Sequence, residues 1–279
     1  MSFEPETTME TTLLPVGYVD ENGAVHRDVE LHAMTGREDD LLAARGTAWK
    51  SRIGQVLTNC IDRIGPYATK PDIAKALRAL PSTDRMWMLI RLRVLSLGDV
   101  YELPLTCPHC DVESTHRVML SSFVAGDGQG RYERTITLPG GRTARWVLLG
   151  WEAESALEFL GRDESESKAE IDRKRNSITL FSRLVSYGDY TFSRDFTKRH
   201  PETKMLEIPE ADMAALQGMP YLHRGLIYQE IKRVEDALLP LDFTVVCPRV
   251  ACGKGSEAEL ELRDFFSVTS CGLAGTSAD

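Results

Sequence analysis

The sequence predicts an α+β protein of two related halves, each a β-hairpin, then helices, then a second hairpin that carries two cysteines. Three observations predict this: strand patterns flank both cysteine pairs, amphipathic helical patterns precede them, and the same elements occur twice in the same order. We expect a shared structural zinc site to join the halves. The chain of 279 residues is long enough for two such units.

Shifts in composition divide the chain into five segments. These are a disordered N-terminus (1–12), the first half (13–125), a glycine-rich linker (126–130), the second half (131–268) and a flexible C-terminal tail (269–279). Within the second half, the highly charged segment 161–176 and the polar segment 188–212 have no counterpart in the first. We expect both to be solvated surfaces or mobile connections.

The first half contains recognisable start and stop signals. A hairpin is predicted around the turn that contains Asn22-Gly23. Thr35 and Glu38 have the spacing of a capping box and open a helix. Apolar residues at helical spacing predict longer helices at about 48–64 and 82–98, and strand patterns then flank the first cysteine pair.

The second half follows the same order at low identity. Leu138-Pro139 corresponds to Leu14-Pro15 in the first hairpin, and a helix is predicted at about 168–187. Met219-Pro220 corresponds to Leu80-Pro81 at the start of the last long helix. The agreement in order is our reason for interpreting the chain as an internal duplication.

Four of the six cysteines form two close pairs on predicted turns between strands. The candidate metal ligands are Cys107, Cys110, Cys247 and Cys252. Four thiolates are a ligand set for tetrahedral Zn²⁺, and the duplication explains why the pairs are so far apart in the chain. A redox pair, disulfides or unreactive thiols are the alternatives. We expect His109 to face solvent and Cys60 to lie in the core.

Composition and motifs also exclude function classes. A net charge of −9 disfavours broad nucleic-acid binding, and no apolar run is long enough to cross a membrane. The polar N-terminus lacks the pattern of a secretory signal, so we expect a cytoplasmic protein. Four cysteines would fill the coordination shell of zinc, and motifs of hydrolases or nucleotide-binding enzymes are absent from the sequence. We therefore expect no enzymatic activity and no small-molecule substrate.

Ordered motifs across residues 13–125 carry a family resemblance. They are the Leu-Pro-x-Gly segment, Met34–Leu42, Thr58–Ile61, Asp84-Arg85, Leu89–Arg91, Leu95–Asp99, Cys107–Cys110 and Val118–Leu120. In these motifs the chain resembles the baseplate hub assembly chaperones of T-even-like phages and related contractile tails. It departs from that family in its second copy, where four residues instead of two separate the cysteines.

The resemblance implies a cytoplasmic assembly factor, in some settings particle-associated, for the baseplate of a contractile tail or injection system. Its partners would be baseplate or tail proteins, bound at the acidic N-terminus or the charged insertions. Three alternatives remain: a resident structural subunit of the particle, a zinc-ribbon nucleic-acid adaptor and, last, a metalloenzyme.

Overall fold

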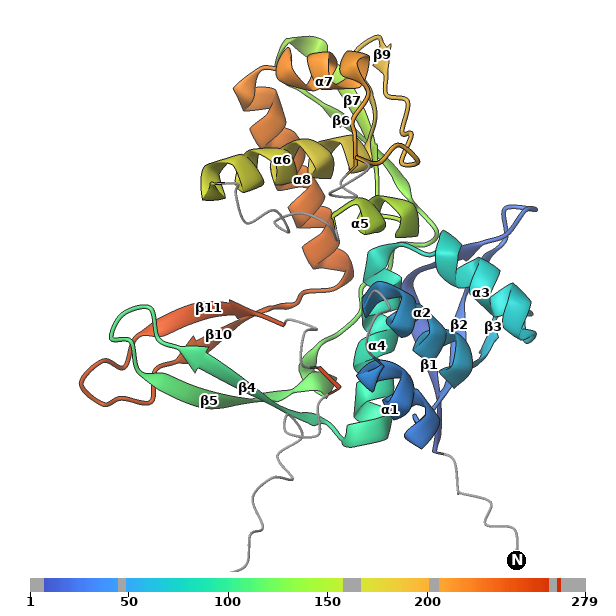
Figure 1. Cartoon of the computed structure of the whole chain (residues 1–279), viewed down its shortest axis with the longest axis vertical. Coiled ribbons are helices and arrows are strands. Elements are labelled where there is room, and N and C mark those ends of the chain that lie inside the picture. Colours follow the sequence, from blue (N-terminus) through green and yellow to red (C-terminus); the bar gives the residue numbers. More distant parts are fainter. Residues whose placement is uncertain (1–7, 45–48, 158–166, 201–205, 261–264, 267–279) are drawn as a thin grey trace, which may run out of the picture.

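A computed structural model of the chain describes residues 8–44, 49–157, 167–200, 206–260 and 265–266. Two bodies, each of helices and a small antiparallel sheet, lie one above the other, and a pair of β-hairpins projects sideways from them (Figure 1). The predicted α+β class is confirmed. We call the projecting pair, residues 100–119 and 242–259, the arm.

The first body is a three-stranded sheet of order β1-β2-β3 packed against helices. Its elements are β1 (Met9–Val19), β2 (Val25–His32), α1 (Gly36–Ala43), α2 (Trp49–Cys60), β3 (Ile61–Ile64), α3 (Lys70–Ala79) and α4 (Ser82–Leu97). Thr35 caps α1 in the predicted capping box with Glu38, and α4 ends at Gly98 as expected.

The second body has a four-stranded sheet of order β6-β7-β8-β9. Its elements are β6 (Glu133–Thr137), β7 (Thr143–Val147), α5 (Trp151–Leu157), α6 (Lys168–Arg183), β8 (Leu184–Tyr187), β9 (Tyr190–Thr191), α7 (Glu210–Gln217) and α8 (Tyr221–Leu238). The arm is formed by β4 (Val100–Thr106) with β5 (Glu113–Met119) and by β10 (Asp242–Val246) with β11 (Gly255–Glu259).

Two of the predicted helices extend beyond the ends of the observed helices. The helix expected at 48–64 ends at Cys60, and the one expected at 168–187 ends at Arg183. In both places the chain continues as a four-residue strand that pairs with the second strand of the preceding hairpin. Helical spacing cannot reveal this boundary, because the strand is stabilised by a partner distant in sequence.

Two further differences concern the N-terminal boundary and the segment 65–81, which contains Pro66, Pro71 and Pro81 and for which no helix is predicted. Strand β1 begins at Met9, so residues 9–12 are part of the sheet rather than the disordered terminus, and they pair with β2. Residues 1–7 and 267–279 lie outside the described residues. Helix α3 was not predicted, although Thr69 caps it and Pro71 occupies its first turn, where proline is tolerated.

Part of the polar segment 188–212 is anchored rather than mobile. Asp212, at the start of α7, is 1% exposed and accepts hydrogen bonds from the hydroxyl groups of Tyr190 and Ser193. Phe192 is buried beside them and belongs to the core of the second body. The buried carboxylate therefore fixes residues 190–193 to α7.

The two cores exchange residues between the halves. Leu239, Leu260 and Phe265, from the second half, belong to the core of the first body. Val16, from the first half, belongs to the core of the second. Each half therefore completes the core of the other.

The linker 126–130 is bound along its length rather than loose. Pairing of β1 with β2 is interrupted between Leu13 and Tyr18. Within this interruption the carbonyl groups of Pro15 and Val16 accept hydrogen bonds from the N–H groups of Gly128 (2.6 Å) and Gly130 (2.9 Å). The Gly126 N–H donates to the carbonyl of Leu238 at the end of α8 (2.8 Å). The linker thus connects β1 to α8.

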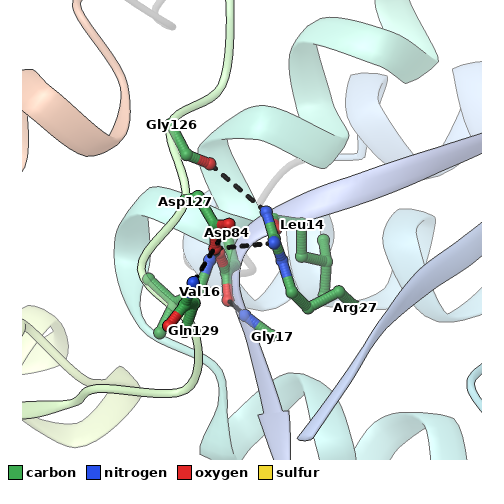
Figure 2. Close-up of polar contacts among 8 residues, drawn as sticks. All are labelled: Leu14, Val16, Gly17, Arg27, Asp84, Gly126, Asp127 and Gln129. Atoms are coloured by element: carbon green, nitrogen blue, oxygen red, sulfur yellow. Dashed lines mark hydrogen bonds and ion pairs between the residues drawn. The ribbon is translucent and has the colours of Figure 1, made fainter.

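Asp84 also binds the interrupted part of β1 (Figure 2). Its carboxylate, in the first turn of α4, accepts the N–H groups of Val16 and Gly17, both at 2.8 Å. Arg27 reaches from β2 to the carbonyl of Leu14 and to Asp127 in the linker. These contacts satisfy the backbone groups that the broken strand pairing leaves unpaired.

Replacing Gly126 by alanine tests the anchoring of the linker. The added Cβ would lie 2.1 Å from the carbonyl oxygen of Ala237, so backbone must shift. We expect Gly126→Ala to lower the free energy of unfolding by about 1–3 kcal/mol in urea denaturation. Gly225→Ala in α8, whose Cβ meets nothing within 4 Å, is the control and should be at least as stable as wild type, because alanine favours the helix. A midpoint of Gly126→Ala equal to that of wild type would contradict the anchoring.

The pH dependence of stability tests Asp84. Burial raises the pKa of this carboxyl to about 7, although the N–H groups of Val16 and Gly17 lower it. The native state then holds a proton that the unfolded chain releases near pH 4, so the contribution of Asp84 to stability falls as pH rises from about 4 to about 7. We expect wild type to lose at least about 1 kcal/mol relative to Asp84→Asn between pH 5 and 7.5. Parallel profiles would show that Asp84 does not titrate in this range.

Candidate metal centre

The first pair of cysteines lies at the tip of the hairpin β4–β5. Cys107 follows β4 directly, and its N–H donates to the carbonyl of Val112 across the turn (2.9 Å). The N–H of Asp111 donates a hydrogen bond to the carbonyl of Cys107 (2.9 Å). Asp111 has a φ of 55°, which lets the chain reverse directly after Cys110. The turn therefore presents both thiols on the same side.

The second pair lies at the tip of β10–β11, in a longer turn. The N–H of Cys247 donates to the carbonyl of Lys254 (3.0 Å), and that of Cys252 donates to the carbonyl of Arg249 (2.8 Å). Gly253, with a φ of 54°, takes the place that Asp111 has in the first turn. The two additional residues form a loop on which the Val250 side chain is fully exposed.

The structure brings the four predicted cysteines together. Their Sγ atoms all lie within 4.8 Å of one another, with Cys107 and Cys252 3.9 Å apart and Cys110 and Cys247 3.6 Å apart. A tetrahedral ion with Zn–S bonds of about 2.3 Å requires sulfur–sulfur separations of about 3.8 Å. The cluster therefore has the dimensions of a four-thiolate metal site, and its donors suit a soft metal ion.

The thiols also influence one another electrostatically. The N–H of Val112 lowers the pKa of Cys110 to about 7, helped by neighbouring sulfur atoms. The N–H of Arg249 lowers the pKa of Cys247, but burial and the neighbouring thiols outweigh it and raise that pKa to about 12. Several thiolates so close together repel one another unless a cation lies between them. The arrangement is thus compatible with a metal ion bound among the four sulfur atoms.

The remaining candidate residues lie apart from the cluster. His109 is exposed and is not one of the clustered side chains, and Cys60 is fully buried in the first core, both as expected. Burial raises the pKa of Cys60 to about 12. Cys271 lies outside the described residues. The clustered sulfur atoms are well beyond the disulfide bond length of about 2.05 Å, and all described cysteines are free.

Fold and site together define an α+β protein with a four-cysteine cluster. Comparison with protein families adds that residues 9–125 match the family described as T4 bacteriophage base plate protein. The match covers less than half of the chain and supports a phage baseplate-related protein. The same comparisons find no matching curated protein and no matching solved structure. Among the described residues, no helix has the length and apolar character needed to cross a membrane.

The motif residues of the matched segment bind one another. The N–H of Met34 donates to the Ser96 hydroxyl at the end of α4 (2.9 Å). The carboxylate of Glu38, 4% exposed, accepts hydrogen bonds from Thr35 and from the Asn59 side chain. Together with Asp84, these buried or half-buried polar contacts fix α4 to β1 and to the segment after β2, and α1 to α2. The capping box is recognisable from local spacing, whereas the contacts of Ser96, Asn59 and Asp84 join residues distant in the chain.

Metal content tests whether both cysteine pairs hold the same ion. We expect about one metal ion per purified chain, lost in Cys107→Ser and in Cys247→Ser alike, with a lower melting temperature in both. Cys60→Ala is the control, because Cys60 lies outside the cluster and its replacement leaves four thiols in place. The measurement is elemental analysis by mass spectrometry. Metal retained in one of the two serine variants would show that the pairs do not share a site.

Proposed function

We propose that this protein is a non-enzymatic assembly factor for the baseplate of a phage-like contractile tail or injection system. The observation that carries the proposal is the match of residues 9–125 to the baseplate family. In this role the protein holds a baseplate or tail protein, and covers its apolar surface, until assembly is complete.

The proposal assigns a structural Zn²⁺ ion to the four cysteines. Zinc binds four thiolates in tetrahedral geometry, and the sulfur separations of 3.6 and 3.9 Å suit that geometry. Four protein ligands leave no open position for a catalytic water, which supports a role in stability. Cys110 and Cys247 come from different halves and are 137 residues apart in sequence, so the ion would fasten the halves to each other.

An internal duplication accounts for the architecture. The pairing of β2 with β3 and that of β7 with β8 are both antiparallel, and each contains one irregularity. Gly65 and Gly188 follow these short strands with φ values of 52° and 57°. Pro81 and Pro220 are the N-caps of α4 and α8. These features support the correspondence between the halves that the sequence suggested.

Aromatic contacts at the base of the arm also support an internal duplication. Tyr101 of the first half packs against Phe265 of the second, with ring centroids 5.3 Å apart. Phe123 of the first half packs against Phe243 of the second, at 6.1 Å. The contacts cross in both directions, as in a symmetric dimer whose two subunits have been joined into one chain.

The net charge and the place of assembly also enter the proposal. The net charge of −9 argues against a nucleic-acid adaptor, since a phosphate backbone would be repelled. The protein would act in the cytoplasm of the producing cell, where particles assemble.

A resident baseplate subunit is the second candidate, and it is favoured by the exposed Val246 and Val250 on the arm, 59% and 100% exposed.

Mass spectrometry of purified particles and of the soluble lysate separates the two candidates. An assembly factor is expected in the lysate, absent from finished particles, and required for particle formation when its gene is deleted. A fixed stoichiometry in the particle would instead identify a resident subunit. Normal particles from the deletion strain would contradict both.

A further inference from the structure

A cavity of about 550 Å³ lies at the seam where α5, α6 and α8 of the second body meet α2 and α4 of the first. Its volume falls in the range of small-molecule and side-chain binding sites, about 300–1,000 Å³. Much of its wall is apolar. The apolar lining residues are Ile53, Met86, Leu89, Trp151, Leu239 and Leu241.

The charged side chains that line this seam cavity neutralise one another. Lys50 and Arg85 pair with Glu154, Arg183 pairs with Glu235, and Lys232 pairs with Asp236 and Asp242. Four cations therefore face four carboxylates. A ligand with a net charge would have to break one of these pairs or remain uncompensated in a half-buried site. The balance favours a neutral ligand.

Two polar atoms of the lining lack a hydrogen-bond partner among the described residues. They are the hydroxyl oxygen of Thr83 and the Nε atom of Arg183, and both are buried. Arg183 as a whole is 8% exposed, and its terminal nitrogen is already bound to Glu235. Its Nε–H is a donor, so it requires an acceptor, whereas the Thr83 hydroxyl can donate or accept. A neutral amide supplies both kinds of group.

We propose that the seam cavity binds a segment of a partner protein, with one apolar side chain inserted and its neutral peptide groups hydrogen-bonded to Thr83 and Arg183. The apolar wall receives the side chain. The two unpartnered atoms each have less than 1 Å² of exposed surface, so they bind the peptide groups once the side chains that cover them shift. The proposal deepens the assembly function, because it gives the held partner a place on this chain. Only the identification of the partner as a baseplate or tail protein rests on the proposed function.

The binding step can be tested on the purified, metal-loaded full chain with small probes. N-acetyl-leucinamide has the proposed chemistry, whereas N-acetyl-leucine carries a carboxylate and leucinamide carries an ammonium group. The reporter is the ¹³C-methyl resonance of Met86, assigned with Met86→Leu, and the exposed Met119 on the arm is the reference. We expect a saturable shift of Met86 alone, with a dissociation constant on the order of millimolar for the neutral probe. The charged probes should bind at least about tenfold more weakly.

Two variants test the hydrogen bonds. Thr83→Val and Arg183→Lys keep the size or the charge of the side chain but remove the unpartnered atom. We expect each to weaken N-acetyl-leucinamide binding at least about fivefold. Retained metal and an unchanged melting curve confirm that the variants are folded. No saturable shift at up to about 50 mM probe, or equal binding of all three probes, would overturn the site.

Particle assembly tests the role of the cavity separately from the role of the protein. Thr83→Trp fills the cavity, and Ser122→Trp, at an exposed position beside the arm, is the matched control. In a deletion strain we expect Ser122→Trp to restore particles and Thr83→Trp to fail, with both proteins folded and metal-bound. Restoration by both would overturn docking in the cavity and leave the assembly function standing. Normal particle formation in the deletion strain, without any restored gene, would overturn the assembly function itself.

Discussion

Four sulfur atoms within 4.8 Å of one another impose the constraint on which the rest of the molecule depends. They come from two hairpins of only two strands each, and an isolated two-stranded hairpin is marginal in water. A cavity of about 410 Å³ separates the hairpins next to the cysteines, so apolar packing alone does not join them there. A metal ion between the sulfurs would fix both hairpins at once. It would also close a loop of well over one hundred residues, which removes much freedom from the unfolded chain.

A second connection between the two halves lies where the two bodies meet. Asp84 and the linker both bind the interrupted part of β1, and Gly126 connects the linker to the end of α8. The cysteine cluster and the seam are separate connections between the same two halves. With a metal ion bound, the two connections would limit rotation of one body against the other, and the seam cavity lies between them.

The sequence was most informative where the decisive contacts are local. The capping box at Thr35, the helix end at Gly98 and the paired cysteines are spaced within a few residues, and all could be recognised. The ends of α2 and α6 could not, because β3 and β8 exist only through pairing with β2 and β7. The glycines of the linker were noticed but not explained, since the atoms that crowd Gly126 belong to Ala237, more than one hundred residues away. The cavity depends on how the bodies meet, which no local pattern encodes. The same holds for the Thr83 hydroxyl and the Arg183 Nε atom, which lack a hydrogen-bond partner among the described residues.

The limits of the family match suggest why two halves share one chain. Residues 9–125 contain two of the four cysteines, and they leave the first core without Leu239, Leu260 and Phe265. The second half supplies what this segment lacks. Because both halves are in one chain, they meet in an intramolecular step at high effective concentration. The seam depends on the same union: Trp151 of α5 packs against Gly54 of α2, and a Cβ added at residue 54 would lie 2.7 Å from the indole ring.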